Sequence, residues 1–170
     1  MQNYFELFSL QAGFDIDLKD LEGAYQKQII QYHPDKFASK DTKQQSVALQ
    51  NTSLINDAFA TLKSPLLRGT YLLELQGINA FDEKDTQMQP DFLIMQIELR
   101  ELLEVLEKTK DEIKLDDFIE NIEQKIEQNI AKIKQAFANN ALIEVKNLVR
   151  ELKFYSQLSA QAKQLMDEWL

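Results

Sequence analysis

The residues best suited to chemistry in this sequence form one short run, Tyr32-His33-Pro34-Asp35-Lys36. An imidazole and a carboxylate lie two positions apart there, and the proline between them restricts the backbone. His33 is the only histidine and the 170-residue chain has no cysteine, so thiol nucleophiles, disulfides and thiolate metal sites are excluded. The sequence also lacks a glycine-rich phosphate loop. We therefore expect no enzyme, no metal and no cofactor. Pro34 stiffens the loop, so the imidazole and the carboxylate are presented in a fixed pose, which would lower the entropy lost on docking.

Charge and hydropathy exclude two further classes of protein. The formal net charge of −9 argues against nucleic-acid binding, because affinity for phosphate backbones comes chiefly from clustered lysine and arginine. No stretch approaches the roughly 18 consecutive apolar residues of a membrane-spanning helix, and the start of the chain has no basic segment before an apolar run. We therefore expect no membrane partner and a soluble, cytoplasmic protein. The acidity lies mostly beyond Leu75, which indicates two halves with different partners.

The fold class is predicted to be all-α, because apolar residues recur at spacings of three and four and glycine and proline are few. A short apolar turn over residues 4–8 opens the chain, and Asp17 is placed to cap a helix whose apolar face ends at Tyr32. Pro34 disfavours helical geometry at His33, so this helix is expected to stop there. A third helix follows and carries the apolar residues Val47, Leu54, Ile55, Ala58, Phe59 and Leu62.

A domain boundary is predicted after a short apolar helix over residues 66–75. Gly77, Asn79 and the polar run that ends at Pro90 are typical of a linker. The prediction is an N-terminal domain over 1–76, a linker over 77–90 and a C-terminal domain over 91–170.

The C-terminal domain is predicted to be a three-helix bundle. Its helical patterns cover residues 91–108, 112–138 and 141–169, separated by the charged stretch near Lys110 and by Asn139-Asn140. The middle pattern has a narrow apolar seam, which favours antiparallel packing with short loops. The seam consists of Ile119, Ile122, Ile126, Ile130, Ile133 and Phe137.

With its flanking helices, the run around His33 resembles the J-domain family. The segment Leu54-Ile55-Asn56-Asp57-Ala58-Phe59-Ala60-Thr61-Leu62 follows at the spacing of that family's third helix. The resemblance implies an N-terminal J-domain that engages a DnaK-type chaperone in its ATP-bound form and promotes ATP hydrolysis, with the catalytic residues in the partner. It assigns chaperone binding to the matching positions Lys27, His33, Pro34, Asp35 and Lys36.

One feature departs from the J-domain pattern. Members of that family usually carry several basic residues on the solvent face of the second helix, whereas Ala24-Tyr25-Gln26-Lys27-Gln28-Ile29-Ile30 offers only Lys27. Electrostatic steering toward the chaperone should therefore be weaker. We expect a dedicated partner with a less acidic docking surface.

The resemblance narrows to the HscB-like co-chaperones over nearly the whole length. It rests on Tyr4-Phe5-Glu6-Leu7-Phe8, Tyr32-His33-Pro34-Asp35-Lys36-Phe37-Ala38-Ser39, Arg68-Gly69-Thr70-Tyr71-Leu72-Leu73 and the stretch 92–101. It implies two partners, the DnaK-type chaperone HscA and the scaffold protein IscU, in iron–sulfur cluster assembly and transfer. Some relatives add a cysteine-rich zinc module at the front, which this chain does not share.

A helical wheel over residues 91–108 gives two apolar stripes, and a three-helix bundle can bury only one of them. The first, expected in the core, consists of Phe92, Met95, Leu99, Leu102, Leu103 and Leu106. The second lies among carboxylates on the opposite side, as at a docking site. In the last helix Phe154 lies off the predicted core stripe and is expected to be exposed, like the second stripe. The HscB resemblance assigns scaffold binding to Leu93, Ile94, Ile97, Glu98, Glu101 and Phe154; Val105, where the family has an acidic residue, is not included.

The sequence leaves several alternatives open. Taken alone, His33-Pro34-Asp35 fits a turn that caps two helices, and Glu98 and Glu101 each fit a solvated face. The second stripe of residues 91–108 could pack against the first half of the chain or a second copy, and the protein would then be a self-associating helical structural protein. A J-domain protein that serves other clients would need a Gly/Phe-rich or β-rich region, which the sequence lacks.

Overall fold

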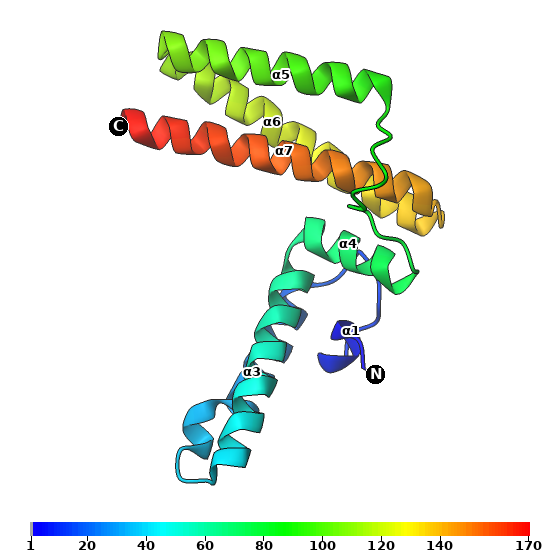
Figure 1. The fold of residues 1–170 in the computed structure, drawn as a ribbon, viewed down its shortest axis with the longest axis vertical. Coiled ribbons are helices and arrows are strands. Elements are labelled where there is room, and N and C mark those ends of the chain that lie inside the picture. Colours follow the sequence, from blue (N-terminus) through cyan, green and yellow to red (C-terminus); the bar gives the residue numbers. More distant parts are fainter. Residues whose placement is uncertain (1) are drawn as a thin grey trace. The chain divides into compact units, whose positions relative to one another are not determined.

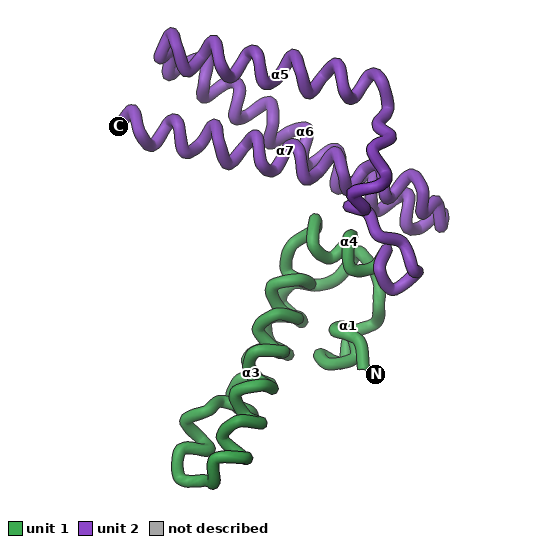
Figure 2. Tube along the Cα trace, in the orientation of Figure 1, with its two compact units in different colours: residues 1–72 green, residues 73–170 purple. Residues whose placement is uncertain are grey.

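The computed structural model describes residues 2–170, and no strand occurs in that range (Figure 1). The predicted all-α class is therefore confirmed. The chain divides into two compact units, residues 1–72 and 73–170 (Figure 2), and the division falls within the helix α4. The elements of the described chain are α1 (Tyr4–Leu7), α2 (Leu18–Tyr32), the 3-10 helix η1 (Pro34–Phe37), α3 (Thr42–Lys63), α4 (Pro65–Leu75), α5 (Pro90–Thr109), α6 (Glu112–Ala138) and α7 (Leu142–Trp169).

The first unit is built around a hairpin of α2 and α3. The carboxylate of Asp17 accepts hydrogen bonds from the N–H groups of the first turn of α2, as the sequence predicted. The Tyr25 ring stacks on the Phe59 ring with 4.0 Å between centroids, and its hydroxyl donates to the Asn56 side chain at 2.8 Å. These contacts tie α2 to α3 along the hairpin.

The short helix α1 and the start of α4 cover the core of this unit. The Tyr4 ring stacks on the Tyr71 ring at 4.6 Å, and the Tyr4 N–H donates to the Tyr71 hydroxyl at 2.9 Å. The buried residues of the core come from α1 and the residue that follows it, from α2 and from α3, and they are Phe5, Phe8, Leu21, Ile55, Ala58 and Leu62. Burial of aromatic and aliphatic side chains of this size is the dominant stabilising contribution in a domain without disulfides.

The second unit is the predicted three-helix bundle. Lys110 directly follows α5, and Asn140 lies in the turn between α6 and α7. Both have left-handed backbone geometry, with φ of 51° and 54°, which is typical of residues that end a helix. In Figure 1, α5 lies along only part of α6 and α7, which are longer by seven and eight residues. Phe92 and Tyr155 pack edge to face at 5.9 Å in the core between α5 and α7.

Residues 77–90, predicted to form a linker, are fastened to α7. Arg150 donates to the carbonyl oxygens of Asp85 and Gln87 at 2.8 and 3.0 Å, and the Lys146 ammonium group forms an ion pair with the Asp85 carboxylate. The Lys153 ammonium lies 4.5 Å from the centroid of the Phe81 ring. The polar run is therefore part of the second unit.

The division between units lies four residues earlier than the predicted boundary after residue 76. Leu73 is fully buried, and its carbonyl oxygen accepts from the N–H groups of Gln76 and Ile78 at 3.0 and 2.9 Å. These bonds join the last turn of α4 to the segment that follows. The last turn of α4 consequently groups with the second unit.

Candidate protein-docking sites

The turn after α2 is shaped by His33 and Pro34. His33 has extended backbone geometry, with φ of −61° and ψ of 135°, so α2 ends at Tyr32 as predicted. Pro34 occupies the first position of η1, where a missing N–H costs nothing. The Asp35 N–H donates to Nδ1 of His33 at 3.2 Å, and the Lys36 N–H donates to the His33 carbonyl oxygen at 3.0 Å. The turn is therefore fixed by its own hydrogen bonds.

The same turn presents its side chains to solvent. The side chain of His33 is 46% exposed and that of Asp35 is 93% exposed. Because Nδ1 of the neutral His33 ring accepts a hydrogen bond, the ring proton is assigned to Nε2, which leaves one donor free. His33 thus caps η1, which agrees with the interpretation of the run as a helix-capping turn, and its side chain is exposed at the same time. The turn offers a ring N–H donor and a carboxylate acceptor in a defined pose.

Two basic residues predicted to bind the chaperone are also exposed, Lys27 on α2 and Lys36 in η1. Between Lys27 and the turn α2 has no further charged residue, and Ile30, three residues after Lys27, is largely exposed. The structure therefore brings Lys36 next to His33 and Asp35, with Lys27 about two helical turns earlier on α2.

A second candidate site lies on α5. Leu93, Ile94 and Ile97 are between 47% and 55% exposed, as the helical wheel predicted. Glu98 and Glu101 are exposed on the same helix. A contiguous apolar group rimmed by carboxylates is unusual on the solvent face of a monomer, because exposed apolar residues normally occur singly. We call these five residues the α5 patch.

The predicted exposure of Phe154 is wrong. Its side chain is 5% exposed, and its ring packs edge to face on the Phe92 ring at 5.7 Å. The Arg100 guanidinium covers the Phe154 ring at 5.3 Å. The physical reason is that α7 packs against both α5 and α6, so its buried arc is wider than a single stripe. Phe154 is therefore part of the bundle core.

Two apolar residues extend the exposed face of α5 beyond the predicted patch. Leu102, expected in the core, and Val105, which was not included, are both about half exposed. The Glu104 carboxylate pairs with the Lys108 ammonium group at 3.3 Å near this end of the face. The position of Val105 on the helical wheel already indicated exposure. Leu102 lies at the edge of the buried stripe, where a helical wheel does not distinguish a buried from an exposed side chain.

A half-buried carboxylate, that of Glu151, lies between α6 and α7. Burial raises the pKa of the Glu151 carboxyl, an effect that the charge of Lys132 partly opposes. The Asn129 side-chain amide donates to Glu151 at 3.4 Å, but the buried Oδ1 atom of Asn129 has no hydrogen-bond partner within the described chain. This polar pair between α6 and α7 is a local weakness in an otherwise apolar core.

Neither a metal site nor a membrane span is found among residues 2–170. No three acidic or imidazole side chains in that range are placed to hold a metal ion. No helix there combines the length and the apolar character needed to cross a lipid bilayer.

Comparison with known proteins gives the family. The family described as the HSCB C-terminal oligomerisation domain matches residues 88–163, which contain α5, α6 and most of α7. The chaperone HscB from Vibrio cholerae is 33% identical, and the match covers 99% of this chain and 100% of that one with a TM-score of 0.88. The chain belongs to the HscB family of co-chaperones.

Two eukaryotic HscB-type structures agree with this assignment. The human co-chaperone protein HscB is 26% identical over 96% of this chain and 82% of its own, with a TM-score of 0.88. The Jac1 co-chaperone from Saccharomyces cerevisiae covers 96% of each chain with a TM-score of 0.79, and at 21% identity it supports the fold alone. The HscB likeness thus extends over both units of the chain.

Proposed function

We propose that this HscB family member stimulates the ATPase of the DnaK-type chaperone HscA and delivers the scaffold IscU to it, for iron–sulfur cluster assembly and transfer. The observation that carries the proposal is the exposed, self-bonded turn of His33, Pro34 and Asp35, whose side chains are free to contact a partner. ATP hydrolysis takes place in the chaperone, and the cluster is cargo of the scaffold. The cytoplasmic location expected from the sequence stays a prediction.

In the proposed mechanism, the turn acts on the conformational equilibrium of the chaperone. The Asp35 carboxylate pairs with an arginine of HscA in a charge-assisted hydrogen bond, and the Nε2–H group of His33 donates a second bond. Because these contacts form with only one state of the chaperone, they shift its population toward the state that hydrolyses ATP. Lys36 and Lys27 add favourable charge close to this contact.

The α5 patch is proposed to bind IscU. Leu93, Ile94 and Ile97 supply an apolar centre that is desolvated on contact, while Glu98 and Glu101 surround it and set the orientation of a partner with basic residues. Phe154 is buried in the bundle core and is not part of the proposed contact. The two sites lie on different units, so one chain can hold chaperone and scaffold together.

The test is an ATPase assay with purified HscA and IscU. We expect the chain to accelerate steady-state hydrolysis by HscA, and IscU to increase the acceleration, because one bridging protein raises the effective concentration of the scaffold at the chaperone. An HscA turnover rate that does not respond to the chain would refute the proposal.

A second candidate function is self-association through the bundle. It is favoured by the description of the matching family as an oligomerisation domain and by the exposed apolar face of α5. It expects a dimer that buries Leu93 and Ile97. Sedimentation velocity over a range of protein concentrations distinguishes the two functions, because a monomer at all concentrations leaves the patch free for IscU.

A further inference from the structure

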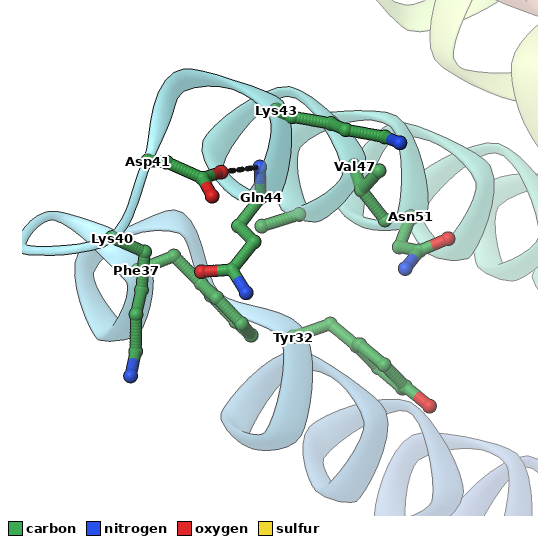
Figure 3. Close-up of a pocket in the computed structure, with 9 residues that line it drawn as sticks. Tyr32, Phe37, Lys40, Asp41, Lys43, Gln44, Val47 and Asn51 are labelled. Carbon is green, nitrogen blue, oxygen red and sulfur yellow. Dashed lines mark hydrogen bonds between the residues drawn. The ribbon is translucent and has the colours of Figure 1, made fainter.

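A groove opens in the first unit where the end of α2, η1 and the start of α3 meet (Figure 3). Its volume is about 470 Å³, within the range of sites that bury a small ligand or a large side chain. It begins directly beside the candidate chaperone contact, since Tyr32 precedes His33 and Phe37 ends η1. The lining residues are Tyr32, Phe37, Lys40, Asp41, Lys43, Gln44, Val47, Ala48 and Asn51, and we call this the tip groove.

The floor of the tip groove is apolar. The rings of Tyr32 and Phe37 form one side of this floor, and Val47 on α3 forms the other side (Figure 3). Val47 is 47% exposed, although it follows the helical pattern of an apolar face. An aliphatic or aromatic side chain of a partner would bury this floor at a gain of roughly 25 cal/mol for each Å² of apolar surface removed from water.

The rim of the tip groove is cationic. Lys40 and Lys43 both line it, and neither forms an ion pair within the described chain. Asp41 is the one acidic residue in the lining, and its carboxylate is occupied as the cap of α3, where it accepts from the Gln44 N–H at 2.8 Å. The two lysines outweigh the single charge of Asp41, so the lining keeps a formal net charge of +1 (two bases against one acid).

This arrangement contrasts with the charge of the rest of the molecule. The chain has a formal net charge of −9, and α2 offers little positive charge beside its exposed Ile30. Lys36, Lys40 and Lys43 instead concentrate positive charge on the other side of the His33 turn. The basic character that α2 lacks is thus supplied by η1 and the first turn of α3.

We propose that the tip groove is a second contact for the DnaK-type chaperone and takes a segment in which an apolar side chain stands next to an aspartate or glutamate. The inference rests on the proposed function and names the chemistry of its partner. The apolar side chain packs on Tyr32, Phe37 and Val47, and the carboxylate pairs with Lys40 or Lys43. Because the groove adjoins the turn, one chaperone surface can engage both without a second ordering cost.

The test compares two glutamate substitutions on α3. Val47→Glu places a carboxylate in the groove, where it repels an acidic segment, while Leu49→Glu makes the same charge change at a 62% exposed position outside the lining. In the HscA ATPase assay we expect Val47→Glu to raise the half-maximal concentration about tenfold, the effect of losing one good interface contact, with the maximal rate retained. Leu49→Glu should stay within about twofold of wild type. Equal effects of the two substitutions would overturn the proposal.

A second pair of changes guards against a folding defect. Lys40→Gln with Lys43→Gln removes two exposed charges without touching the core, and we expect it to weaken binding and to flatten the dependence on salt. Circular dichroism should show unchanged helicity in every variant. If the salt dependence of this variant is identical to that of wild type, the two lysines do not bind the chaperone, and the proposed carboxylate of its segment is refuted.

Direct binding separates failure of the groove from failure of the proposed function. Amide signals of the isotope-labelled full chain are followed by NMR while unlabelled HscA with ATP is added. Stimulation with no change of signals at Val47 or Lys43 would overturn the groove alone. Changed groove signals without stimulation would overturn the proposed function and leave the groove as a binding site. Unchanged signals without stimulation would overturn both.

Discussion

The backbone N–H of Asp35 donates a hydrogen bond to the Nδ1 atom of His33 across 3.2 Å. This bond fixes the tautomer and the pose of the imidazole, which together present its Nε2–H group. We therefore predict that His33→Gln abolishes stimulation of HscA, because an amide on a longer, flexible stem does not reproduce the ring donor. The measurement is the ATPase rate of HscA at saturating chain concentration.

Binding of IscU serves as the internal control for this variant. His33 lies outside the core of the first unit, so His33→Gln should leave helicity and scaffold affinity unchanged. Full stimulation by the variant would contradict the role assigned to the turn.

Substitutions in the α5 patch are predicted to weaken binding of IscU. Leu93→Ala with Ile97→Ala should weaken IscU binding by about 2 kcal/mol, roughly thirtyfold in Kd, as is typical of residues at the centre of an interface. Both side chains are half exposed, so the free energy of unfolding should change little. Isothermal titration with IscU measures the effect.

A matched control uses Ile113→Ala with Ile143→Ala, two apolar side chains that are even more exposed and lie on α6 and α7. That pair should bind IscU like wild type. If both double variants titrate like wild type, the α5 patch does not bind the scaffold.

Phe154 is predicted to act through stability. Its ring is enclosed by Phe92, Tyr155 and the Arg100 guanidinium, so Phe154→Ala leaves a cavity and should cost roughly 3–5 kcal/mol of unfolding free energy. Urea denaturation measures this loss, and Phe154→Leu should recover much of it by refilling the space. A variant as stable as wild type would show that the ring is a surface contact after all.

The features that the sequence predicted well have local causes. Pro34 constrains the residue before it, so the end of α2 at Tyr32 follows from two adjacent residues. Asp17 caps the helix that begins one residue later. The exposure of Leu93, Ile94 and Ile97 followed from the period of one helix, because Phe92 and its stripe already occupied the buried side.

The features that the sequence did not reveal depend on distant residues. A wheel for α7 does not tell how many helices surround it, so the burial of Phe154 was not predicted. Residues 77–90 have the composition of a linker, and their partner Arg150 lies 63 and 65 residues away from the two carbonyl groups that it binds. The tip groove joins α2, η1 and α3, and no single helix carries its pattern.

The contact between Asp85 and Lys146 makes stability depend on pH. The hydrogen bond from Lys146 lowers the pKa of the Asp85 carboxyl below its ordinary value of 3.8. A lowered folded-state pKa means that the stabilising contribution is complete above the ordinary value and is lost as the pH falls through the lowered one. Asp85→Asn should therefore be less stable than wild type at about pH 7, and the difference should shrink toward about pH 3.

Urea denaturation of both proteins at several pH values checks this, with Glu83→Gln as the control. Glu83 is exposed on the same segment and has no ion pair within the described chain. A stability difference between wild type and Asp85→Asn that is independent of pH would mean that the carboxylate charge contributes nothing.

The Glu151 carboxyl predicts a dependence of stability on pH that is opposite to that of Asp85. Burial raises its pKa above the ordinary 4.5, so the ionised form is less favourable in the fold than in the unfolded chain. Wild-type stability should then fall as the pH rises from 4.5 through the raised pKa. Glu151→Gln removes this loss, and its new amide can donate to the unpartnered Oδ1 of Asn129. We expect a higher melting temperature than wild type at neutral pH and no advantage below the ordinary pKa, measured by circular dichroism at both extremes. A variant that is less stable than wild type at neutral pH would show that the carboxylate is satisfied where it lies.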